Sequence, residues 1–145
     1  MSESTEPTTA AGDDLDALLD HLIQHALEQV EAEGDFHPFA AAIDSGGELR
    51  MVGMEPEGEE PSPQEIVDQL VASLAASAGR GEIRASGVCA NVTLPGPEGD
   101  SEAVVVQLEH RDDDPVDIAL PYKAHDDHLH TGELIAGLGV RRVFT

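Results

Sequence analysis

Three histidines near the C-terminal end of the chain, His125, His128 and His130, have the types and spacing that most clearly suggest chemistry. Two aspartates separate the first histidine from the second, and one leucine separates the second from the third. Imidazole and carboxylate groups are good ligands for zinc and similar divalent ions. On an extended chain His128 and His130 point the same way. The pattern predicts a metal site at residues 125–130, and the competing interpretation is a solvated acidic loop that happens to hold histidines.

Two other histidines and the single cysteine are weaker candidates for chemistry. His21 and His25 lie one helical turn apart, a spacing at which paired imidazoles can hold a metal. No glutamate follows His21, and both histidines fall on the rim or far side of an apolar helical stripe, so we interpret them as part of a solvated face. Cys89 lies in the middle of an expected strand with no Cys-His signature around it, which indicates a structural role.

The run Glu109-His110-Arg111 stands at the end of an expected strand. Functional side chains often occupy such positions, but so do charges that mark the limit of a core, and the sequence leaves both interpretations open. The chain contains no Gly-rich phosphate loop and no Gly-x-Ser-x-Gly elbow. We therefore predict no catalytic residues, and no cofactor beyond zinc or a similar ion at the histidines.

Charge is the strongest feature of the composition. The 145 residues include 30 Asp and Glu against 7 Lys and Arg, for a formal net charge of −23, while 40% of the residues are apolar. The acids are spread along most polar stretches, as expected for a carboxylate coat that keeps a folded protein soluble in concentrated salt. The alternative is a binding surface for a basic partner. Nucleic acid is excluded as a partner, because it is itself a polyanion and no basic stripe is present.

Length and patterning predict one cytoplasmic domain. No apolar run approaches the roughly 20 residues that cross a bilayer, so we expect no membrane contact, and the first fourteen residues do not have the pattern of a secretory signal. A lone cysteine is consistent with a reducing compartment. We expect residues 1–12 to form a disordered acidic tail, residues 13–145 a single domain, and residues 55–61 an exposed linker.

The periodic stretches predict two helices. Apolar residues recur at steps of three and four from Leu15 to Val30, and the expected helix starts at a cap on Asp13 or Asp14 and stops before Gly34. The second helix begins at a capping box whose first residue is Ser62, and the helix ends at Gly79. Both helices have an apolar face wide enough to cover a sheet.

Alternating apolar residues predict the strands. Residues 36–43 and 48–54 flank a Gly-Gly turn, residues 81–94 and 103–110 form a long hairpin, and residues 116–122 form a further strand. Ile83 and Val88 have opposite parity, which predicts one extra residue between them, placed at Gly87. We expect a polar loop at 123–132, either a helix or a strand at 134–139, and an edge strand at 140–144.

The fold class is therefore α+β: an antiparallel sheet of about five strands carrying two amphipathic helices, in the order αββαβββ plus a C-terminal edge strand. Over about residues 14–122 this order resembles Roadblock-type and profilin-like small α/β domains, although a Roadblock-type domain would close with a helix. The resemblance implies a dimerising interaction module. The run Phe36-His37-Pro38-Phe39 is also similar to small bacterial proteins without an assigned function.

Together these features predict a non-catalytic binding or dimerising module adapted to high salt, with a homodimer as the expected assembly. The alternative is a metal-dependent enzyme that uses the histidine-rich segment 125–130.

Overall fold

The structure is a computed structural model. It describes residues 10–34, 36–52, 62–94, 101–125 and 128–144. Most of the expected N-terminal tail and the whole of the expected linker at 55–61 lie outside the described residues.

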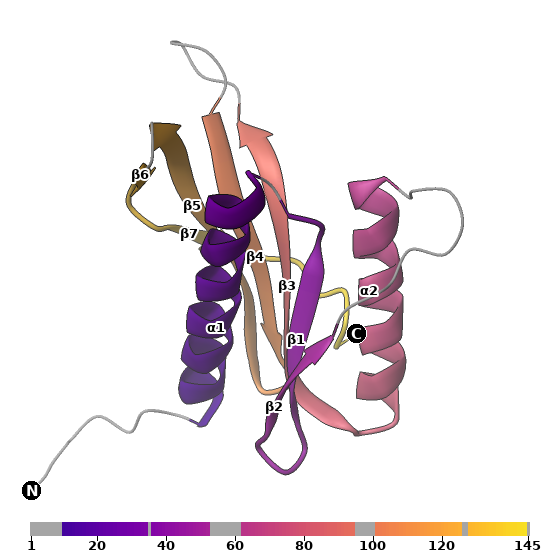
Figure 1. The fold of residues 1–145 in the computed structure, drawn as a ribbon. Coiled ribbons are helices and arrows are strands. Elements are labelled where there is room, and N and C mark those ends of the chain that lie inside the picture. Colours follow the sequence, from indigo (N-terminus) through magenta and orange to yellow (C-terminus); the bar gives the residue numbers. More distant parts are fainter. Residues whose placement is uncertain (1–9, 35, 53–61, 95–100, 126–127, 145) are drawn as a thin grey trace, which may run out of the picture.

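Two helices lie on opposite sides of a single antiparallel sheet (Figure 1). The strand order is β2-β1-β3-β4-β5-β6, with β7 paired to β5, so the described residues form seven strands where about five were expected. The α+β class is confirmed. The elements are α1 (Ala10–Glu33), β1 (Phe39–Asp44), β2 (Leu49–Val52), α2 (Pro63–Gly79), β3 (Ile83–Leu94), β4 (Ser101–His110), β5 (Asp113–His125), β6 (His128–Thr131) and β7 (Ile135–Leu138).

Helix α1 covers one side of the sheet, which we call the α1 face. Its buried residues recur at steps of four along one stripe, as the periodicity predicts: Leu18, Leu22, Ala26 and Val30. The helix ends at Glu33, where Gly34 takes a positive φ of 80°. Its predicted start is wrong: because the helix begins at Ala10, Asp14 lies inside it and is buried.

Helix α2 covers part of the opposite side, the α2 face. It begins as predicted, with the Ser62 hydroxyl accepting a hydrogen bond from the Glu65 amide at 3.2 Å and with Pro63 in the first turn. Its apolar stripe of Ile66, Leu70 and Leu74 packs mainly against β1 and β3. Strand β1 is therefore buried on both sides, which explains its run of three small alanines.

The predicted extra residue in β3 exists, but its predicted position is wrong. Ile43 pairs with Ala85 and Asp44 pairs with Ile83, so Arg84 is the residue left over. Gly87 pairs regularly on both sides and is needed for another reason. A Cβ atom there would lie 2.5 Å from a methyl group of Leu22, so glycine lets α1 approach the sheet.

The C-terminal third differs most from expectation. Strand β5 extends to His125, and much of the predicted loop at 123–132 forms β6. Both β6 and β7 pair with the side of β5 that β4 leaves free, and the Gly132 amide donates to the Pro121 carbonyl at 2.8 Å between them. Residues 128–138 therefore form one interrupted strand, which we call the outer edge.

The predicted edge strand at 140–144 is wrong. These residues, which we call the C-terminal strap, pair with no strand. They run to the α2 face, where Val143 is buried and Phe144 packs against the same apolar cluster as α2 (Figure 1).

Candidate functional site

Two adjacent buried residues at the end of β4, Glu109 and His110, organise the polar chemistry of the molecule. Their side chains are on opposite faces of the sheet, as expected for neighbours in a strand, and the residues are only 3% and 2% exposed. Polar groups buried so deeply require hydrogen-bonding partners. Both find several, from segments far away in the sequence.

His110 faces α1 and forms a cluster with Asp14 and Arg84. The Asp14 carboxylate accepts from Arg84 at 2.8 and 3.0 Å, and one of its oxygens lies 2.9 Å from His110 Nε2. The Asp112 amide donates to His110 Nδ1 at 3.0 Å, so this nitrogen is an acceptor and Nε2 carries the proton. The cluster fastens α1 to strands β3 and β4.

An aspartate beside a histidine forms two thirds of a hydrolytic triad, but here both imidazole nitrogens are used. A general base must offer a free nitrogen to a nucleophile, and the Asp112 amide uses the one that Asp14 leaves. Burial raises the pKa of Asp14, but the hydrogen bonds from Arg84 and His110 and the positive charge of Arg84 outweigh burial and hold it below its usual range. The Asp14 carboxylate and both His110 nitrogens are therefore occupied by partners within the described residues, which leaves the imidazole no free nitrogen for a nucleophile.

Glu109 faces the other way and holds the C-terminal strap. Its carboxylate accepts from three consecutive backbone amides, those of Arg142, Val143 and Phe144, at 3.0–3.3 Å. The Arg141 guanidinium also donates to the His110 carbonyl at 3.2 Å. Hydrogen bonds to a charged acceptor are stronger than neutral ones, so Glu109 fixes the path of the chain immediately after β7.

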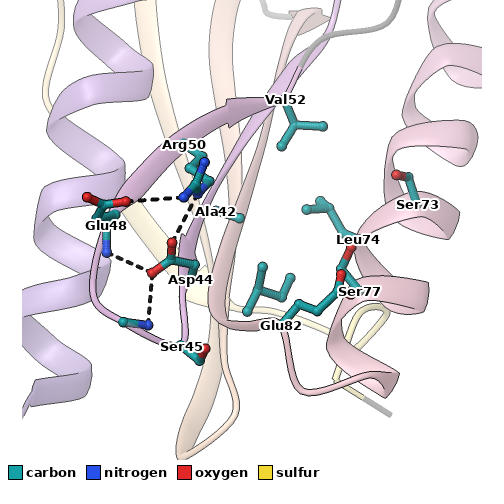
Figure 2. Close-up of a pocket in the computed structure, with 12 residues that line it drawn as sticks. Ala42, Asp44, Ser45, Glu48, Arg50, Val52, Ser73, Leu74, Ser77 and Glu82 are labelled. Atoms are coloured by element: carbon teal, nitrogen blue, oxygen red, sulfur yellow. Dashed lines mark hydrogen bonds and ion pairs between the residues drawn. The ribbon is translucent and has the colours of Figure 1, made fainter.

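A pocket of about 600 Å³ lies between the β1–β2 hairpin and the second half of α2 (Figure 2). Val52 and Leu74 point into it, while the polar groups on the hairpin are occupied by one another. Asp44 accepts from the Gly46 and Glu48 amides and from Arg50 at 2.9–3.0 Å. The hydrogen bond from the Glu48 amide, followed by that from Arg50, lowers the pKa of Asp44. These interactions shape the hairpin and leave no charged group free to bind a ligand.

The most exposed large apolar side chains among the described residues lie on the outer edge or directly after it. Leu138 is 93% exposed, and three residues near it are also exposed: Leu134, Ile135 and Val140. We call these four the apolar edge patch. No acid occurs after Glu133, whereas Arg141 and Arg142 follow the patch. The segment that carries this patch is therefore uncharged to cationic on a protein of net charge −23, although Asp117 of β5 lies opposite Gly137.

The three predicted metal-binding histidines lie on β5 and β6. The strand register places His125 opposite His128, and Lys123 opposite His130. His130 is exposed, whereas the side chains of His125 and His128 lie outside the description, so the metal site stays a prediction. Among the described side chains, no group of three His, Cys, Asp or Glu is arranged to hold a metal.

The remaining candidates from the sequence are His21, His25 and Cys89. His21 is exposed, as predicted, and His25 packs edge-on against Phe39 with ring centres 4.7 Å apart. Cys89 is fully buried, and burial raises the pKa of its thiol, which makes it unreactive. None of these three takes part in the clusters around Glu109 and His110.

Comparison with known proteins returned no match, whether to a protein-family model, to a curated protein or to a solved structure. The resemblance to Roadblock-type and profilin-like domains therefore stays a prediction from element order. Among the described helices, none has the length and hydropathy needed to cross a membrane.

Proposed function

We propose that this chain is a non-catalytic, cytoplasmic interaction module that forms a homodimer through its outer edge and is adapted to high salt. The observation that carries the proposal is the outer edge itself. An edge strand offers unpaired backbone groups to a second chain, and proteins that avoid such pairing place lysine or proline on the edge. Residues 128–138 contain neither, and the exposed side chain of Leu138 projects from them.

Charge supports a second copy as the partner. Two molecules of net charge −23 repel each other, and the repulsion is weakest where both surfaces lack acids. The stretch at 134–145 contributes no acid of its own, and it includes the whole apolar edge patch. Salt should strengthen the pairing, because the Debye length falls from about 10 Å at 0.1 M to about 3 Å at 1 M. The acidic surface and the dimer therefore fit the same saline environment.

The test is sedimentation of Leu138→Asp at rising sodium chloride concentrations, beside the wild type. Because Leu138 is almost fully exposed, the change should leave the fold intact while placing a charge at the centre of the interface. We expect the wild type to dimerise more tightly in chloride than in sucrose of matched osmolality, and Leu138→Asp to stay monomeric.

The matched control is Met51→Asp, which adds the same charge to a 43% exposed residue on β2, the opposite edge. It should dimerise like the wild type. A wild type that is monomeric at every salt concentration, or two variants that behave alike, would contradict the proposal.

A second candidate function is metal binding at residues 125–130, favoured by the register that pairs His125 with His128. Zinc titrated into the chain should bind with one site per molecule, and His128→Ala should abolish that site, while His21→Ala on the surface of α1 should not. Calorimetry measures both. Equal loss of binding in the two variants, or no saturable binding, would remove the metal and with it the alternative of a metal-dependent enzyme.

A further inference from the structure

A groove of about 390 Å³ lies on the α2 face, between the first half of α2 and strands β3 and β4. Helix α2 packs mainly on β1 and β3 and leaves the sheet beyond β3 open on this side. The volume falls within the range of small-molecule sites. The walls are aliphatic, with no aromatic ring among them: Val67, Val71, Val88, Ala90, Val92 and Val105.

Two polar groups of the groove are incompletely paired within the described residues: Gln107 Oε1 accepts no hydrogen bond, and the Arg142 guanidinium donates to the Val140 carbonyl at 3.5 Å but meets no carboxylate. Gln107 Oε1 is buried, yet it accepts no hydrogen bond within the described part of the chain. A buried acceptor in this state has a free-energy cost and calls for a donor. Because Gln107 lines the groove, a molecule bound there can provide one.

The second group is the Arg142 guanidinium, which lines the same groove. In a chain with 30 acids for 7 cations, arginines are expected to pair with carboxylates, and Arg50, Arg80, Arg84 and Arg111 do. Among the described residues Arg142 forms no such ion pair. Its charge partly offsets the rise that burial gives to the pKa of Asp117, but the two do not bond.

The groove also carries one negative group, Asp68, which accepts a hydrogen bond from Gln64 at 2.9 Å. One cationic and one anionic side chain thus line the same largely aliphatic groove. We propose that this groove binds a small aliphatic zwitterion of the size of a free aliphatic amino acid. Its carboxylate pairs with Arg142, its ammonium donates to Gln107 Oε1 and faces Asp68, and its side chain packs among the valines.

Net charge favours a zwitterion over a simple anion. The field of a protein of charge −23 disfavours any ligand that brings further negative charge, whereas a zwitterion brings none. Aromatic amino acids fit less well, because the walls offer aliphatic contacts alone and no ring for stacking.

The experiment titrates the full chain with three probes, followed by amide and methyl NMR shifts. L-Leucine carries the carboxylate, the ammonium group and the aliphatic side chain. 4-Methylpentanoate lacks the ammonium group, and isopentylamine lacks the carboxylate. We expect leucine to shift resonances of the valines in the groove and to bind about tenfold or more tightly than either partial probe. No saturable shift with leucine, or equal affinity for the three probes, would overturn the proposal.

Two variants locate the site. Arg142→Gln should lower the affinity for leucine about tenfold and leave the affinity for isopentylamine unchanged. Arg80 is an exposed arginine beyond the end of α2, and Arg80→Gln should change neither affinity. Gln107→Leu should weaken leucine while the stability of the fold stays equal or rises, because a buried unpaired acceptor is removed. Loss of leucine binding only where stability also falls would indicate a structural role for these residues and contradict the site.

The groove is independent of the proposed dimer. Strand register places Leu138 opposite Val116, whose side chain lies on the α1 face, so Leu138→Asp should keep wild-type affinity for leucine. If leucine has no effect and Arg142→Gln instead weakens self-association, the groove is part of the dimer interface and the zwitterion site is wrong.

Discussion

The two edges of the sheet are built in opposite ways. The edge at β2 is four residues long, and beside it the hairpin holds its charges in a local network of Asp44, Glu48 and Arg50. The outer edge spans residues 128–138, has no lysine, arginine or proline, and carries three of the four residues of the apolar edge patch. Short, charged edges resist strand addition, whereas long apolar ones invite it. The difference is the basis of the proposal that the outer edge, and not the β2 edge, pairs with a second copy.

The two faces of the sheet are also fastened by different anchors. On the α1 face, the buried Asp14 and the half-buried Arg84 fasten α1 to the sheet, and Gly47 of the hairpin lies against Arg84. On the α2 face, Glu109 holds the C-terminal strap. The role of each anchor can therefore be tested by substituting Glu109 and Asp14 one at a time.

The largest effect is expected from Glu109→Gln. The amide group of glutamine cannot satisfy three backbone donors as a carboxylate does, so unfolding in urea should show a loss of about 3 kcal/mol. The dimer should weaken as well, because the strap positions the end of β7. Glu48→Gln on the hairpin removes the same charge at an exposed position and should cost under about 1 kcal/mol. Equal costs for the two variants would show that the strap is not held as described.

A smaller effect is expected from Asp14→Asn, about 2 kcal/mol at neutral pH, because Arg84 and His110 lose a charged acceptor in a partly buried cluster. The pKa of Asp14 is lowered in the folded state. Its contribution to stability is therefore complete above its ordinary pKa near 3.8 and is lost as the pH falls through the lower, folded value.

The stability gap between the wild type and Asp14→Asn should accordingly be constant from pH 7 to about 5 and shrink in more acidic solution. Asp16→Asn, an exposed change on the same helix, should show no gap of this kind, and neither variant should alter dimerisation at the outer edge. A gap that widens on acidification would mean that the cluster is not held by an ionised Asp14.

Local patterns predicted the parts of the fold that depend on local physics. The capping of α2 by Ser62, the end of α1 at Gly34 and the alternation in β4 and β5 all follow from a few neighbouring residues, and all are confirmed. The N-terminus of α1 was predicted wrongly because Asp14 looks like a cap in sequence. Its partners, Arg84 and His110, are 70 and 96 residues away.

The candidate site, too, could be predicted only where its signal lies in neighbouring residues. His110 continues the alternation of Val104, Val106 and Leu108, so the sequence does contain a signal that it faces the core. The position of Glu109 at a strand end marks it as a candidate but does not reveal its role, because its partners are backbone amides, which every residue except proline possesses. The strap was expected to form an edge strand, but the Glu109 carboxylate holds it in another path. The outer edge was predicted only in part, because residues 128–131 look like a loop in isolation and become strand only by pairing with β5.

The central claim, that the outer edge pairs with a second copy while the β2 edge does not, is tested most directly by amide hydrogen exchange at two protein concentrations in high salt. Pairing buries backbone amides of residues 128–138, so their exchange should slow as the concentration rises through the dimer range. The amides of β2 should exchange at the same rate in both samples. Exchange at the outer edge that is independent of concentration, or slowing at β2 instead, would contradict the account.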